Sequence, residues 1–160
     1  MQVKIINSQD ILDIDLGLFK KVSKYIADKF DRDKSRELNI IFVDRQKIRQ
    51  LNKEYRKKDN ETDVLSFPYG ENDLFGSVDN KDGFSVIGEI VISPEVAREN
   101  SGKIIRDDIK SWNLIREIIL LIIHGILHLY SYDHEKRDEE IKMDNLQDSL
   151  LRDVFSSFDI

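Results

Sequence analysis

The sequence predicts an α+β fold, in which helices cover a small mixed sheet of about four strands. The first observation is the order of hydrophobic patterns along the 160 residues, which reads β-α-β-α-β-β-α-α-α. The second is the segment 112–130, which is apolar on nearly all sides, although its unbroken run, 118–123, is only six residues long. Because a membrane-spanning helix needs about 20 apolar residues, this segment is expected to be a buried central helix. The length favours one domain, residues 1–160. The shortness of the apolar run predicts no membrane association.

Four short runs have the composition and length of strands. Gln2–Ile6 alternates between apolar and polar residues, and Glu37–Val43 is rich in β-branched residues. Asp63–Tyr69 is the third run, with Pro68 marking its end or an edge of the sheet, because proline cannot donate to a strand ladder. Gly88–Ile92 completes the predicted sheet.

Five segments have helical periodicity or helix-start signals. Leu16–Phe30 repeats apolar residues at helical spacing, and Asp44 can cap the next helix. Ser93, followed by a proline, is expected to start a third helix that ends near Ser101. Ser111 is the expected cap of the central helix, and a last helix has apolar positions from 141 to 155.

The composition restricts the compartment and the chemistry. There are no cysteines, which excludes disulfides and thiolate ligands, so a metal must bind through His, Asp or Glu. No secretory segment stands at the N-terminus, which predicts a cytoplasmic protein. The formal net charge of −6 argues against indiscriminate nucleic-acid binding, because that affinity comes mostly from cations on phosphates.

The charge is distributed unevenly along the chain. Residues 45–58 hold seven cations and one acid, a local balance of +6. Residues 133–148 hold seven acids and three cations, a local balance of −4. The basic stretch can guide a polyanion, whereas the simpler interpretation is a solvated helix face.

All three histidines lie within eleven residues: His124, His128 and His134. The first two are four residues apart and therefore share one face of a helix. A third imidazole after a turn can close a site with three nitrogen ligands, and an open fourth position is typical of catalytic zinc. Nickel, cobalt or copper would also suit such a site. The alternative is that the histidines are hydrogen-bonded core residues.

The histidine spacing equals that of the HExxHxxGxxH metalloproteases, but two positions differ. Gly125 stands where those enzymes place their glutamate base, so general-base peptide hydrolysis lacks its carboxylate. Ser131 stands where a glycine usually makes the turn, which costs about 1–2 kcal/mol if left-handed geometry is required. Asp133 can orient an imidazole, or can equally be an exposed turn residue.

A second group of polar residues suits a phosphate. Arg56 offers a planar guanidinium fork, and Lys57 and Lys58 add positive charge beside it. Ser66, on the strand that follows, could line the same cleft. A fourth metal ligand could come from an acidic residue of the polar loop 70–83, which would close the site.

Three motifs, YRKKDNETDVLSFP at 55–68, GEIVIS at 88–93 and HGILHLYSYDH at 124–134, resemble those of the YbeY family. The family consists of metal-dependent endoribonucleases that act in ribosomal RNA maturation. The resemblance implies an α+β fold, zinc bound by His124, His128 and His134, and an essential basic residue at Arg56. Ser131 replaces the glycine of the family's H-G-x-L-H-L-x-G-Y-D-H motif.

These observations together predict a zinc-dependent endoribonuclease that cuts single-stranded RNA. The resemblance implies action on small-subunit ribosomal RNA in maturation and quality control, with the small subunit or assembly factors as partners. Two alternatives are kept: a metalloprotease-like hydrolase, and a non-catalytic assembly factor with a structural metal.

Overall fold

The computed structural model describes residues 1–69, 85–101, 112–132 and 135–160. Their strands form one four-stranded sheet in the order β1-β2-β4-β3. β1 (Gln2–Ser8), β2 (Arg36–Val43) and β4 (Ser85–Ile92) are mutually parallel, and β3 (Val64–Pro68) runs antiparallel beside β4. The predicted mixed sheet is confirmed. β3 is an edge strand that ends at its proline, as expected for a residue that cannot donate to a second neighbour.

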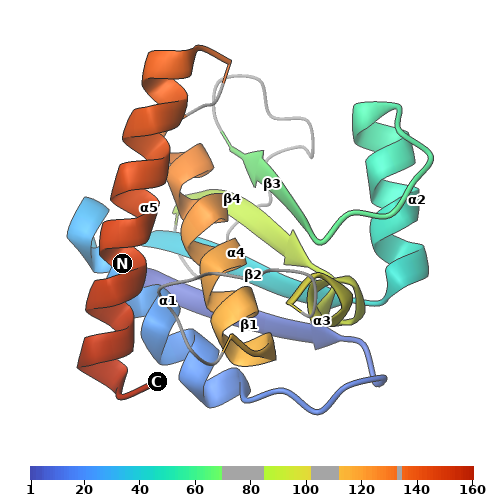
Figure 1. The fold of residues 1–160 in the computed structure, drawn as a ribbon, viewed down its shortest axis with the longest axis horizontal. Helices are drawn as coiled ribbons and strands as arrows, with labels where there is room; N and C mark the ends of the chain where they lie inside the picture. Colours follow the sequence, from blue (N-terminus) through green and yellow to red (C-terminus); the bar gives the residue numbers. More distant parts are fainter. Residues whose placement is uncertain (70–84, 102–111, 133–134) are drawn as a thin grey trace.

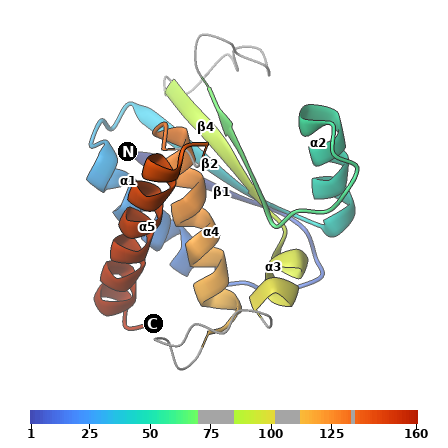
Figure 2. The same cartoon turned by 45° about the horizontal axis from the view of Figure 1, so that its top comes forward.

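Helices cover the two faces of the sheet unequally (Figures 1 and 2). α1 (Leu16–Phe30), α4 (Leu114–Leu129) and α5 (Arg137–Phe158) lie on one face. α2 (Arg45–Arg56) lies on the opposite face near β3, and α3 (Pro94–Ser101) follows β4 and packs against α4. α4 therefore lies between the sheet and α5, which confirms the predicted central helix.

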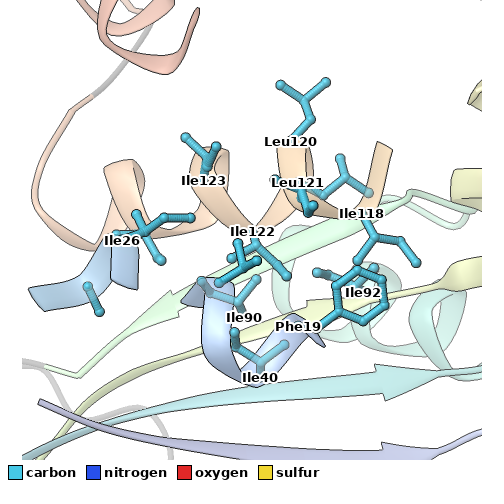
Figure 3. Close-up of a cluster of buried hydrophobic side chains, with 14 of the residues drawn as sticks. Phe19, Ile26, Ile40, Ile90, Ile92, Ile118, Leu120, Leu121, Ile122 and Ile123 are labelled. Carbon is cyan, nitrogen blue, oxygen red and sulfur yellow. The ribbon is translucent and has the colours of Figure 1, made fainter. Parts of the chain in front are cut away.

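The main core forms around α4 (Figure 3). Ten of its sixteen residues are buried, which explains why its sequence is apolar on nearly all sides. Ile118 and Ile122 lie over Ile90 and Ile92 of β4, and all four side chains are fully buried. This packing fixes the position and rotation of the helix that carries His124 and His128.

Of the three predicted helix caps, Asp44 and Ser93 stand at the positions expected and Ser111 needs correction. Asp44 caps α2 as expected, since its side chain accepts a hydrogen bond from the Lys47 N–H. α4 is capped by Asn113, whose side chain accepts from the Arg116 N–H, and Ser111 lies outside the described residues. Ser93 precedes α3, but its hydroxyl has no hydrogen-bond partner in the described part of the chain.

A helix that spans a bilayer needs about 20 predominantly apolar residues. Among the described residues, none is long and apolar enough to span a membrane. The six-residue apolar run of α4 is accounted for by its burial between the sheet and α5.

Candidate metal and phosphate site

A pocket of about 500 Å³ opens beside the edge strand β3. Its wall combines side chains from α2, β3, the C-terminal half of α4 and the turn after it: Arg56, Val64, Ser66, His124, His128, Ser131 and Tyr132. Since β3 has no strand on its outer side in the described sheet, residues from both faces of the sheet can reach this pocket. Two of the three predicted metal ligands, the predicted phosphate-binding arginine and Ser66 thus meet in one place.

His124 and His128 are oriented towards each other from successive turns of α4. Their Nε2 atoms are 3.0 Å apart, and the ring planes are inclined at 76°. Two nitrogens bound tetrahedrally at 2.0–2.1 Å to one zinc ion would be about 3.3 Å apart. The two imidazoles therefore already present their nitrogens at close to the spacing that a shared metal requires.

The donor set fits a borderline divalent metal such as zinc, because imidazole nitrogen is a ligand that such ions prefer. Within the described ranges, no group of three or more potential ligands is assembled. His134 and Asp133 lie outside the described residues, as does the acidic loop 70–83. The third ligand, the second-shell role of Asp133 and a fourth ligand from the loop remain predictions.

Arg56 is the last residue of α2, and its exposed side chain lines the same pocket as the two imidazoles. It forms no ion pair with the described residues, so its guanidinium is available for an anion. Ser66 reaches the pocket because it alternates with Leu65 and Phe67, which pack under α2 on the opposite face.

Gly125 has a packing role that its place beside His124 does not reveal. A Cβ built on it would lie 2.8–3.0 Å from three side-chain carbons of Ile90. The position faces the sheet, and Ile90 is completely buried. A glutamate here would point into the core, so the metalloprotease alternative loses its base for a steric reason as well as a chemical one.

A family model described as Endoribonuclease YbeY matches residues 4–154. The chain belongs to the YbeY family. The resemblance seen in the three sequence motifs is thereby confirmed over nearly the whole length.

Individual YbeY relatives agree with this membership. An Endoribonuclease YbeY of Oceanobacillus iheyensis is 39% identical over 90% of this chain and 88% of its own length. One from Acetivibrio thermocellus is 33% identical over 96% and 97%. One from Aquifex aeolicus is 45% identical, over 66% of this chain and 61% of its own length. The solution structure of TM1509 from Thermotoga maritima matches with a TM-score of 0.62 and 26% identity, covering 98% of this chain and 91% of that one.

The turn after α4 explains the glycine that the YbeY motif carries at position 131. Ser131 has φ of 68°, in the left-handed region. Its N–H donates to the His128 carbonyl, and the Tyr132 N–H donates to the Leu127 carbonyl, both at 3.0 Å. This pair of bonds defines a Schellman motif, whose left-handed residue is usually glycine. Serine keeps the turn at a conformational cost.

Replacing Ser131 with glycine is expected to stabilise the protein by about 1 kcal/mol, because glycine adopts positive φ without a Cβ clash. Urea denaturation of the metal-free protein measures the change. Lys57→Gly is the matched control, since Lys57 has φ of 60° at the end of α2. A similar gain is expected there. A gain for Lys57→Gly and none for Ser131→Gly would mean that the turn after α4 is not under strain.

Lys57 and Lys58 differ from Arg56 in where they lie. Neither lysine belongs to the pocket wall that the described residues form, although both side chains are exposed. The Lys57 ammonium donates to the Glu54 carbonyl of its own helix at 3.0 Å. The structure thus does not bring Lys57 and Lys58 to the histidines, and their contact with substrate stays a prediction.

Ion pairs in the folded chain offset much of the positive charge of residues 45–58. Arg49 and Lys53 both pair with Asp59, and the hydrogen bond from Arg49 and that from Lys53 lower the pKa of this carboxyl. Arg45 forms ion pairs with Glu61, Glu95 and Glu99. With these four acids the local balance falls from +6 to about +2. Among the described residues, Arg56 and its neighbours Lys57 and Lys58 form no ion pair, so the end of this stretch keeps its positive charge.

Sequence reasoning missed one residue that contacts a predicted ligand directly. Gln147 of α5 lies with its Oε1 3.0 Å from Nδ1 of His124. A signal was present, because Gln147 interrupts an apolar stripe formed by Met143, Leu150 and Val154. A polar side chain in a buried stripe needs a partner. Val64 and Tyr132, which complete the pocket wall, gave no comparable signal.

Proposed function

We propose that this protein is a zinc-dependent endoribonuclease that cleaves single-stranded RNA. His124, His128 and His134 would hold the metal, and Arg56 would bind the phosphate that is cleaved. The observation that carries the proposal is that one pocket is lined by two converging imidazoles and by a guanidinium that forms no ion pair with the described residues. Membership of a family described as Endoribonuclease YbeY supports RNA as the substrate class.

Each pocket residue has a defined part in such a reaction. A divalent ion held by neutral imidazoles keeps its full charge and supplies Lewis acidity, which lowers the pKa of water to about 7. Arg56 would donate to the phosphate oxygens and stabilise the negative charge that grows on them. The attacking oxygen would come from water or from the adjacent ribose 2′-hydroxyl. Ser66, on the β3 side of the pocket, would donate a hydrogen bond to the RNA backbone and hold the RNA in the pocket.

Replacing Arg56 with alanine is expected to slow cleavage of a single-stranded RNA at least about 100-fold, the scale of losing one transition-state donor. Because Arg56 is exposed and unpaired in the described chain, stability should change by less than about 0.5 kcal/mol. Lys47→Ala is the matched control. It also removes one cation from α2, but Lys47 lines a separate pocket on the other face of the sheet.

The assay uses a labelled RNA without secondary structure and protein freed of contaminating nucleases. Lys47→Ala should retain wild-type cleavage. RNA binding by wild type and by Lys47→Ala should weaken as salt rises, since phosphate contacts release counterions. Equal cleavage by wild type and Arg56→Ala would remove Arg56 from the mechanism.

We also propose that the physiological substrate is small-subunit ribosomal RNA, cleaved in the cytoplasm during maturation and quality control. The small subunit or its assembly factors would be the partners. The support is the YbeY resemblance carried by the motifs at 55–68, 88–93 and 124–134. The test is rescue of ribosomal RNA processing in cells that lack their own YbeY protein. Full rescue by Arg56→Ala would favour a non-catalytic assembly factor instead.

A further inference from the structure

Gln147 reaches His124 because of how α5 packs on α4. Met143, Leu150 and Val154 lie on the same stripe of α5 and are buried against the core. Gln147 occupies the position between them, and its Oε1 lies 3.0 Å from Nδ1 of His124. The partners are 23 residues apart, so the contact depends on the tertiary fold.

The chemistry of this contact determines where the imidazole proton is. An amide oxygen can only accept a hydrogen bond, so Nδ1 of His124 must carry the hydrogen. A neutral imidazole has one N–H, which leaves Nε2 of His124 with its lone pair. That lone pair is directed towards Nε2 of His128, 3.0 Å away.

We infer that Gln147 is a positioning residue that holds His124 in the Nδ1–H tautomer, with Nε2 ready to bind the metal. The inference rests on the proposed function, in which His124 is a metal ligand. A partner on the second nitrogen fixes both the tautomer and the rotation of a metal-binding imidazole. Gln147 is neutral, so it does this without adding a negative charge beside the metal.

The first test reads the tautomer in the metal-free, ¹⁵N-labelled full chain, using two-bond ¹H–¹⁵N correlations of the histidine rings. Wild type is expected to show His124 protonated at Nδ1. Gln147→Leu, which keeps the approximate volume but has no acceptor, should shift His124 towards the Nε2–H form. Gln147→Glu retains an acceptor and should preserve the wild-type tautomer.

The second test measures zinc affinity by competition with a chromophoric chelator. Gln147→Leu should bind zinc about 10–100-fold more weakly, the usual effect of losing such a partner. Gln147→Glu should bind at least as tightly as wild type. Asn145→Leu is the matched control, an exposed polar residue of α5 changed in the same way, and should leave affinity unchanged.

Two outcomes would overturn the inference: an Nδ1–H tautomer retained in Gln147→Leu, or wild-type zinc affinity in that variant. If Gln147→Leu does not fold, Gln147→Ala removes the acceptor without adding an apolar side chain, and the same criteria apply. Neither readout uses RNA. A tautomer and affinity that respond to Gln147 in a protein that does not cut RNA would support the inference while rejecting the proposed function.

Discussion

Replacing His128 with alanine is expected to abolish zinc binding at stoichiometric metal and to reduce cleavage of single-stranded RNA by at least about 100-fold. The reason is geometric. His128 supplies one of the two Nε2 atoms that lie 3.0 Å apart in the pocket, and its removal leaves His124 without the imidazole that it faces. Metal content after gel filtration and single-turnover cleavage measure the two losses separately.

His128→Ala is also informative about folding. His128 is only partly buried and lies at the pocket wall, so the metal-free variant should remain folded with a thermal midpoint near that of metal-free wild type. The zinc-dependent rise in midpoint that we expect of wild type should be absent from this variant, because a ligand stabilises only the state that binds it. Undiminished zinc binding by His128→Ala would place the metal elsewhere.

The second large effect is on stability, at Gly125. Gly125→Glu is expected to prevent folding, because it drives a carboxylate into the space occupied by Ile90, where an unpaired charge costs several kcal/mol. That is a large part of the 5–15 kcal/mol that typically stabilises a domain. Circular dichroism and urea titration report the loss.

Alanine at the same position separates packing from charge. Gly125→Ala gains about 1 kcal/mol in helix propensity but overpacks the contact with Ile90 by about 1–3 kcal/mol, so a net destabilisation is expected. Gly17→Ala is the control, since among the described residues its Cβ would meet one side-chain oxygen, at 3.4 Å, on an exposed turn of α1. In Gly17→Ala the gain in helix propensity should therefore appear without an overpacking cost. A folded Gly125→Glu protein with zinc-dependent proteolysis would reopen the metalloprotease alternative.

The elements of the fold were predictable because their signals are local. The helix Leu16–Phe30 was predicted with the bounds it has, and β4 begins three residues before its predicted start at Gly88. The caps were less predictable, because Ser111 and Asn113 are both good capping residues. Which of them starts α4 depends on where the helix first packs.

The site was predictable where spacing alone determines it. His124 and His128 share a face because they are four residues apart, and the structure confirms it. The orientation of Gly125 towards Ile90, the contact of Gln147 and the neutralisation of Arg45 by distant acids all depend on tertiary packing. The spacing of residues in the sequence does not contain that information. The sequence raised left-handed geometry at position 131 only as a condition, and the structure shows that Ser131 adopts it.

We propose that a metal bound by the histidines of one pocket is required for RNA cleavage. The most direct measurement is the cleavage rate of a single-stranded RNA by metal-stripped wild-type protein as zinc is added in known equivalents. We expect no cleavage without metal and a rate that rises until one zinc is bound per chain. Undiminished cleavage by the metal-stripped protein, or no cleavage by the fully loaded one, would contradict the claim.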